Sequence, residues 1–113
     1  ISKNKNISLI VKHLAQVQLP FVALLFGSFA KKKETKHSDY DILVISEKEI
    51  TSLSILPFDI HLTHVTCEEF IQMTRSKEFT VVSEANMYNI PLIGIEDYYR
   101  LLENAYRTTY QTS

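Results

Sequence analysis

Apolar and polar residues along the chain follow two periods, which together predict helices and strands in mixed order. The first predicted helix has Asn6 as a candidate N-cap, and its apolar positions fall at helical spacing: Ile7, Ile10, Val11, Leu14 and Val17. After Pro20 comes an unbroken apolar run over residues 21–26, which is typical of a buried strand. Gly27 and Ser28 end that strand.

Two further strands are predicted from alternation. Residues 39–45 place Tyr40, Ile42 and Val44 on one face, and the segment after Pro57 alternates Phe58, Ile60 and Leu62 with Asp59, His61 and Thr63. The pattern Thr66–Glu69 is that of a capping box, so a helix containing Phe70, Ile71 and Met73 should follow it.

The remainder of the chain predicts a helix over residues 77–88, a short strand over 90–93 and a final helix from Ile95. Pro91 favours an edge position for the short strand. The final helix is predicted from apolar positions at helical spacing, namely Tyr98, Leu101, Leu102, Ala105 and Tyr106. We therefore expect an α/β (α+β) fold, a small mixed β-sheet of about four strands with helices packed on it.

Composition narrows the class of protein. The 113 residues predict one domain over residues 1–113, and an apolar content of 45% is enough for a core. The formal net charge of -1 gives no general footprint for nucleic acid or membrane. The single cysteine, Cys67, allows no internal disulfide, and no signal peptide is visible, so we expect a cytoplasmic protein. Because the chain begins at Ile1 rather than at a methionine, we suspect a processed chain or a domain cut from a longer one.

The candidate chemistry lies around Gly27-Ser28 and two aspartates. Asp39 and Asp41 are two residues apart on a predicted strand, so their carboxylates share a face. Two adjacent carboxylates repel one another unless a cation lies between them, and Mg²⁺ prefers such oxygen ligands. Asp59, on the next strand, reaches the same place if the two strands pair, where it would bind metal and accept a proton from an attacking hydroxyl.

The turn itself suits phosphate. Gly27 permits a sharp change of direction and a close approach of ligand to the main chain, and Ser28 offers a hydroxyl and an N–H group. Lys31 and Lys32, in a lysine-rich run, would neutralise phosphate charge, although such a run is also typical of a solvated loop. His61 and His64 are three apart on a strand, which places them on opposite faces, and only His61 shares the face of Asp59.

Gly27-Ser28, followed after ten residues by Asp39-x-Asp41 on an apolar strand, resembles the polymerase-beta-type nucleotidyltransferase superfamily. Size and layout resemble its minimal nucleotidyltransferase (MNT) branch, over about residues 21–102. The resemblance implies the nucleotidyltransferase fold and Mg²⁺-dependent transfer of a nucleoside monophosphate, AMP from ATP in this branch, to an acceptor hydroxyl. Asp39, Asp41 and Asp59 would be the catalytic and metal-binding residues, in a two-metal site. Gly27, Ser28, Lys31 and Lys32 would bind the nucleotide.

The resemblance also implies partners. The MNT branch often acts with a helical HEPN-type protein as a toxin–antitoxin pair, and other relatives are fused to DNA-binding domains; a homo-oligomer is left open. Two departures from the family pattern stand out: Lys32 occupies a position where glycine is usual, and residues 46–56 make a short link to the third carboxylate. A binding or regulatory module that masks a partner or senses nucleotide, with little catalysis, is the alternative function.

Overall fold

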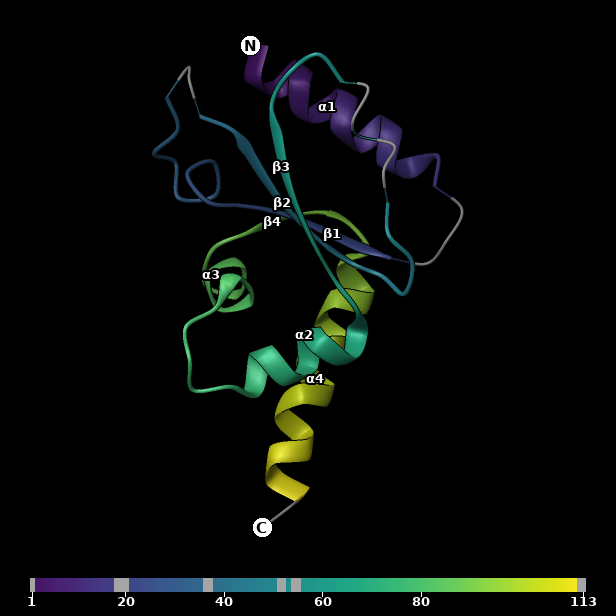
Figure 1. Ribbon diagram of the computed structural model, residues 1–113, viewed down its shortest axis with the longest axis vertical. Helices are drawn as coiled ribbons and strands as arrows, with labels where there is room; N and C mark the ends of the chain where they lie inside the picture. Colours follow the sequence, from purple (N-terminus) through teal and green to yellow (C-terminus); the bar gives the residue numbers. More distant parts are fainter. Residues whose placement is uncertain (1, 18–20, 36–37, 51–52, 54–55, 112–113) are drawn as a thin grey trace.

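The computed structural model describes residues 2–17, 21–35, 38–50, 53 and 56–111. Within these residues one sheet contains four strands: β1 (Val22–Phe26), β2 (Tyr40–Ile45), β3 (Ile60–Val65) and β4 (Ile90–Ile93). Their order across the sheet is β3-β2-β1-β4, and Figure 1 labels each strand. β1 pairs antiparallel with both β2 and β4, whereas β2 and β3 run parallel. The predicted mixed sheet is confirmed, with β4 at an edge.

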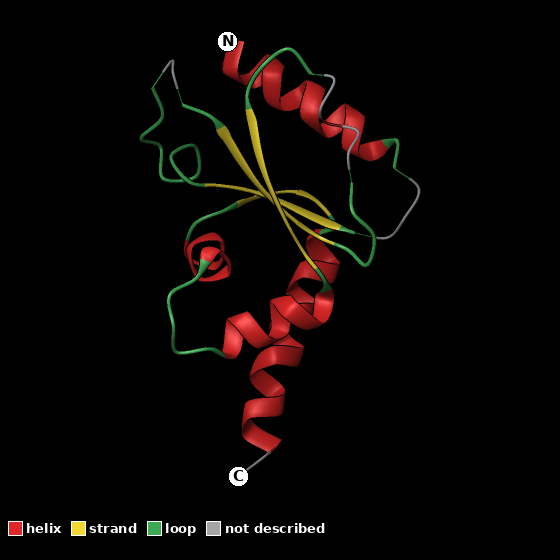
Figure 2. Ribbon diagram, viewed as in Figure 1, coloured by secondary structure: helices red, strands yellow, loops and turns green. Residues whose placement is uncertain are grey.

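Helices cover both faces of the sheet. α1 (Ser2–Ala15) lies on one face, and α2 (Cys67–Arg75), α3 (Val81–Met87) and α4 (Ile95–Gln111) lie on the other (Figure 2). Successive strand residues point to opposite faces, so β1 and β2 contribute to two separate clusters of buried apolar side chains. Leu25 and Ile42 pack with Ile10 on the α1 side. This double burial explains why both strands appear in the sequence as nearly continuous apolar runs.

The second cluster contains Leu24 and Leu43, which pack with Phe70 of α2 and Val82 of α3. Burial of each such side chain contributes about 1.5–3 kcal/mol to folding. Tyr40, Ile42 and Val44 share the α1-side cluster, as the alternation predicted. β1 and β2 are thus packed on both faces. This packing fixes the position of the end of β1, next to Gly27, and of the start of β2, at Asp41.

Side-chain caps set the helix starts, and two predicted starts were wrong. The capping box of α2, formed by Thr66 and Glu69, is confirmed. α3 was predicted from residue 77 but begins at Val81, because Thr80 forms a capping box with Ser83. Phe79 consequently lies outside the helix and is 69% exposed. α1 already begins at Ser2, so Asn6 lies inside it and donates a hydrogen bond to the Tyr40 hydroxyl (3.0 Å) instead of capping.

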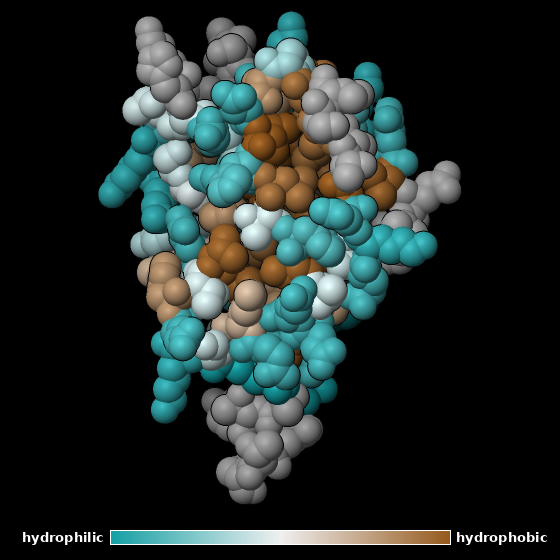
Figure 3. All heavy atoms as spheres, viewed as in Figure 1, coloured by the Kyte–Doolittle hydropathy of each residue, from teal (hydrophilic) through white to brown (hydrophobic). Residues whose placement is uncertain are grey.

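The link between β2 and β3 is a crossover of fourteen residues, 46–59, between the parallel strands. Ile50 and Leu53 from this link join the α1-side cluster, so the link packs against the sheet where it returns the chain to the same end. A pocket beside β3 is lined by residues of the crossover and by Ile60 and Leu62. Figure 3 shows apolar surface on this side of the molecule.

The final helix, α4, is confirmed from Ile95, with Tyr98 and Ala105 buried. Tyr106 departs from the predicted apolar face, since it is 55% exposed. None of the helices in the described part of the chain has the length and apolar character needed to cross a membrane.

Candidate active site

The main chain of Gly27 lies directly against the carboxylate of Asp41. Phe26, the last residue of β1, is the Cα partner of Asp41 on β2, and the chain turns at Gly27 with φ of 72°. A Cβ atom at residue 27 would lie 2.2 Å from Asp41 Oδ2 and 3.0 Å from its Cγ. The positive φ favours glycine here, and a side chain at this position would displace the Asp41 carboxylate. The group that approaches the main chain of Gly27 in the structure is the Asp41 carboxylate, a candidate metal ligand; the predicted approach of a nucleotide to this turn stays a prediction.

After Gly27 the chain folds into a compact turn. The Lys31 N–H donates to the Gly27 carbonyl (3.2 Å), and the Lys33 N–H donates to the Ser28 carbonyl (2.8 Å). The buried Phe29 ring stacks on Tyr40 with centroids 4.4 Å apart. These contacts hold Ser28 at the end of β1, beside the start of β2.

Lys32 is the described non-glycine residue with positive φ, at 59°. Left-handed backbone costs an ordinary residue about 1–2 kcal/mol, which explains why glycine suits this position. The substitution noted in the sequence therefore leaves the backbone in a glycine-like conformation and places the strain on a lysine.

The three predicted carboxylates come from one end of the sheet. Asp39 immediately precedes β2, Asp41 is its second residue, and Asp59 immediately precedes β3. Tyr40 and Ile60 are Cα partners, and the Tyr40 N–H donates to the Asp59 carbonyl (3.2 Å). The backbone therefore places the starts of the two parallel strands side by side, as the prediction for Asp59 required.

The side chains as they stand do not form a closed metal cage. Among the described residues, no three His, Cys, Asp or Glu side chains are arranged to hold one metal ion. The oxygen donors at these strand starts nevertheless suit Mg²⁺ by type. Asp41 is fixed against Gly27, whereas Asp39 and Asp59 are exposed. The residues fit a divalent ion provided that the two exposed carboxylates turn toward Asp41.

His61 contacts Asp41, which the sequence alone did not indicate. The two residues are Cα partners in the parallel pair β2–β3, and His61 Nδ1 lies 3.2 Å from Asp41 Oδ1. The His61 side chain is 72% exposed. His64 lies on the opposite face, as predicted, where its Nε2 is 2.8 Å from the Ser46 carbonyl oxygen. The sequence indicated only that His61 shares a strand face with Asp59, two residues before it; the contact with Asp41 could not be predicted from this.

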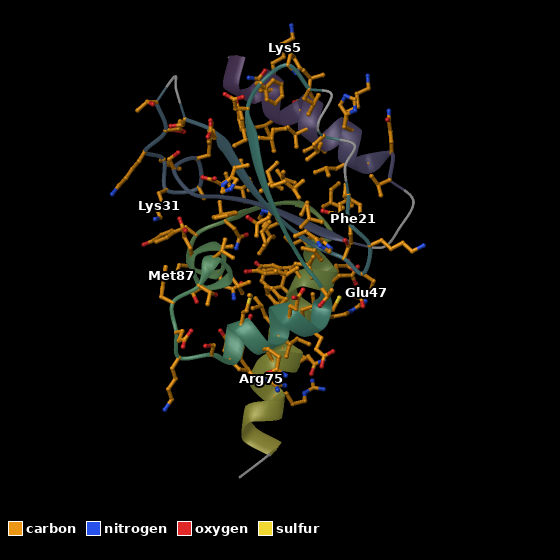
Figure 4. The ribbon with its side chains drawn as sticks, viewed as in Figure 1. Lys5, Phe21, Lys31, Glu47, Arg75 and Met87 are labelled. Atoms are coloured by element: carbon orange, nitrogen blue, oxygen red, sulfur yellow. The ribbon has the colours of Figure 1, made fainter. Side chains whose placement is uncertain are left out.

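The lysines of the turn are exposed, and one of them has a partner that sequence reasoning missed. Lys31 Nζ lies 3.8 Å from Glu84 Oε2 of α3. Figure 4 shows Lys31 on the loop above α3. Such a partly exposed pair adds little stability, and its distance shows that α3 lies beside the turn. Lys36 and His37 lie outside the described residues.

The comparison with protein families agrees with this geometry. A glycine–serine turn ends β1, and the carboxylate of Asp41 on β2 faces it. Residues 5–90 match the family model described as "Polymerase beta, Nucleotidyltransferase". The match spans well over half of the chain, so the chain belongs to this family. No significant match was found among curated proteins or among solved structures.

Proposed function

We propose that the protein is a Mg²⁺-dependent nucleotidyltransferase of the minimal type, which transfers AMP from ATP to a hydroxyl group of a partner. The observation that carries the proposal is the contact between Asp41 and the Gly27 main chain, because it puts a candidate metal ligand against a candidate phosphate-binding turn. Family membership over residues 5–90 supports the same class of reaction.

In this proposal the phosphates of ATP lie along Gly27 and Ser28, and Lys31 and Lys32 offset their charge. Asp39, Asp41 and Asp59 would hold Mg²⁺, in a one- or two-ion site. The bound metal neutralises negative charge on the phosphoryl oxygens. Orientation and charge neutralisation of this kind supply most of the catalysis in phosphoryl transfer.

The reaction itself is a displacement at the α-phosphorus. The acceptor oxygen forms a bond to this phosphorus, the bond to the pyrophosphate oxygen breaks, and pyrophosphate leaves. Asp59 accepts the proton of the attacking hydroxyl, since it is exposed at the start of β3 and an ionised carboxylate can act as a general base. Transfer thus needs an acceptor that approaches from the β3 side of the site.

The acceptor belongs to the proposal and rests on the family resemblance. We propose a protein hydroxyl on a HEPN-type helical partner, with this chain as the antitoxin. A regulator that combines this domain with a DNA-binding domain would use the same nucleotide site to sense ATP. The two arrangements differ in whether label is transferred to another protein.

The test is incubation with ATP labelled in its α-phosphate and Mg²⁺, with and without the protein encoded by the neighbouring gene. We expect label on the partner, and we expect Asp39→Asn or Asp41→Asn to reduce labelling at least about a hundredfold, because each variant loses an ionised oxygen ligand. Asp97→Asn is the matched control, since Asp97 lies at the start of α4 and pairs with Arg100. Circular dichroism checks that the variants fold.

Two results would count against the proposal. Normal labelling by both aspartate variants would remove the carboxylates from the site. Tight binding of the partner without label, in the presence of Mg²⁺ and ATP, would favour the masking module instead.

A further inference from the structure

We propose that the exposed face of α4 is a self-association surface, on which a second copy of this chain packs with its own α4 antiparallel to the first. This surface is independent of the proposed function, since none of the residues that form it lies at the candidate active site. It assigns a partner, another copy of the chain, to a helix face that is apolar and that no other described residues bury.

α4 carries apolar side chains on two adjacent faces. Tyr98 and Ala105 are buried against the domain. Beside them lies an exposed row, in which Ile95, Tyr99 and Tyr106 are 49%, 58% and 55% exposed. At 3.6 residues per turn, these three side chains lie within an arc of about 40° of the helix surface. The solvent side of an amphipathic helix is normally polar, and aromatic residues are enriched in protein interfaces, so the exposed row has the character of a contact surface.

The last part of α4 extends beyond the helix on which it packs. α2 ends at Arg75, whose Nε donates to the Ala105 carbonyl (3.1 Å), whereas α4 continues to Gln111. Figure 1 shows this end of α4 running away from the sheet and past α2. Short helical segments are marginal in water, and most helix stability in proteins comes from packing of an apolar face. A second α4 would supply such packing to the projecting turns.

The charges beside the exposed row favour a second copy with an antiparallel direction. Residues at spacings of four, three and four line one border of the row: Glu96, Arg100, Glu103 and Arg107. Their signs alternate, with a negative charge first. An antiparallel second copy presents the same series in reverse, so each negative charge lies opposite a positive one. A parallel copy in register would oppose like charges instead, which is unfavourable.

The arginines of this border are positioned to reach a second helix. In the antiparallel pair, Glu96 lies opposite the partner subunit's Arg107, and Arg100 lies opposite the partner subunit's Glu103. The Arg100 and Arg107 side chains are 75% and 62% exposed, and each also pairs with a carboxylate of its own helix, Asp97 or Glu103. Exposed ion pairs add little affinity, so the charges set direction and register while the exposed row supplies the binding energy.

The same register lets the two exposed rows interleave. With the charges opposed in this way, the partner subunit's Tyr106 falls between Ile95 and Tyr99 along the contact. The twofold symmetry of the pair places Tyr106 in the equivalent position on the partner. The aromatic side chains therefore fill the spaces between one another, as the side chains of packed helices do.

The contact leaves the candidate active site accessible. Gly94, which directly precedes α4, lies against Phe21 at the start of β1, since a Cβ there would be 2.5 Å from the Phe21 carbonyl oxygen. Gly27 follows the other end of the same strand. Self-association through α4 and nucleotidyl transfer should therefore be separable by mutation.

Sedimentation equilibrium of the whole chain tests the pairing. We expect a monomer–dimer equilibrium with a dissociation constant of about 1–100 µM, since one helix per copy makes a small interface. Tyr99→Ser should weaken self-association about tenfold or more, because it removes a central aromatic side chain. Phe79→Ser is the matched control, since it also removes an exposed aromatic residue but precedes α3, and it should leave the dissociation constant unchanged.

Two charge reversals distinguish a second copy from any other occupant of the surface. Arg100→Glu opposes two glutamates in a self-pair, and Glu103→Arg opposes two arginines. Each variant alone should self-associate about tenfold more weakly than the wild type. An equimolar mixture of the two variants should form a heterodimer, because every glutamate at these positions then faces an arginine. Circular dichroism checks that both variants keep their helices.

A wild-type chain that stays monomeric at about 1 mM would overturn the proposal. A dimer that Tyr99→Ser leaves intact would place the contact elsewhere on the molecule, and a mixture of the charge-reversal variants that does not pair would overturn the antiparallel contact. Binding of a different protein through Tyr99 by a monomeric chain would assign the surface to that protein. Labelling by ATP is a separate measurement, so the proposed function stands or fails independently of these results.

Discussion

At the residue scale, two glycines with the same backbone conformation have different neighbours. Gly27 and Gly94 have φ of 72° and 75°. A Cβ at Gly27 would meet the Asp41 carboxylate, whereas one at Gly94 would lie 2.5 Å from the Phe21 carbonyl oxygen. The two positions therefore share a backbone requirement, and only the first touches the candidate site. This difference separates an effect on folding from an effect on nucleotide binding.

Gly27→Ala and Gly94→Ala should each lower the free energy of unfolding by about 2 kcal/mol or more, because each adds left-handed strain and a steric clash. Only Gly27→Ala should also weaken the binding of ATP and Mg²⁺ to the folded protein, since it displaces Asp41. Urea unfolding measures the free energy of unfolding, and titration calorimetry measures the binding of ATP and Mg²⁺. Equal ATP affinity in the two variants would show that the Gly27–Asp41 contact does not serve the nucleotide.

Individual site residues could be predicted where local sequence decides their geometry. The turn at Gly27 follows from a glycine directly after a buried run. Asp39 was predicted as the first residue of the next strand but lies just before β2, which begins at Tyr40. The contact between His61 and Asp41 depends on the parallel register of two strands that are twenty residues apart in sequence. Glu84, which pairs with Lys31, comes from a helix whose position no local pattern specifies.

At the element scale, one network of side-chain hydrogen bonds connects α2, α3 and α4. The Tyr98 hydroxyl of α4 donates to Asn86 Oδ1 of α3 (2.9 Å) and accepts from Asn89 Nδ2 (3.0 Å). Asn86 Nδ2 in turn donates to Thr74 Oγ1 of α2 (3.2 Å). α3 also carries Glu84, beside Lys31. The network therefore fixes the helix that borders the turn at Gly27 and Ser28.

Tyr98→Phe should lower the free energy of unfolding by about 1–2 kcal/mol at neutral pH, because it leaves the two asparagines without their hydroxyl partner. Burial raises the pKa of Tyr98 above its ordinary value of 10.0. Above that pH the unfolded chain releases this proton while the folded protein still holds it, so wild-type stability falls as pH rises. The phenylalanine variant lacks this pH-dependent loss of stability. The difference in the free energy of unfolding between wild type and Tyr98→Phe should therefore become smaller above pH 10.

Urea unfolding of both proteins at neutral pH and above pH 10 measures this narrowing. Tyr99→Phe is the control, since Tyr99 is the neighbouring residue and is 58% exposed. A difference between wild type and Tyr98→Phe that stays constant through the alkaline range would contradict a buried, proton-retaining Tyr98.

Helices were predictable where a recognised cap begins them. Thr66 and Glu69 form the capping box that their sequence indicates. α3 was predicted too long because serine at residue 83 takes the role usually given to glutamate or glutamine. α1 was predicted too short because its first residues are polar and Asn6 suggested a cap. Asn6 instead lies inside the helix, where it contacts Tyr40.

At the scale of the whole molecule, the sheet separates two apolar clusters that share the same strands. Neighbouring residues of β1 point into different clusters: Leu24 toward α2, α3 and α4, and Leu25 toward α1. The mixed sheet and its helices could be predicted from the order of elements. The strand order and the parallel pairing of β2 with β3 could not, because they depend on contacts between distant segments. Both clusters converge on the strands that carry Gly27 and Asp41, so the integrity of the site should depend on each.

This arrangement predicts that the two sides of the sheet unfold together. Leu24→Ala and Leu25→Ala remove fully buried side chains and should each cost about 2–5 kcal/mol. Because β1 is common to both clusters, each variant should still unfold in one transition. Far-ultraviolet circular dichroism follows the helices, and the near-ultraviolet tyrosine signal follows Tyr40 on one side and Tyr98 on the other. Coincident curves with equally shifted midpoints are expected for each variant, whereas a Leu25→Ala curve that splits into two steps would show that the α1 side folds as a separate unit.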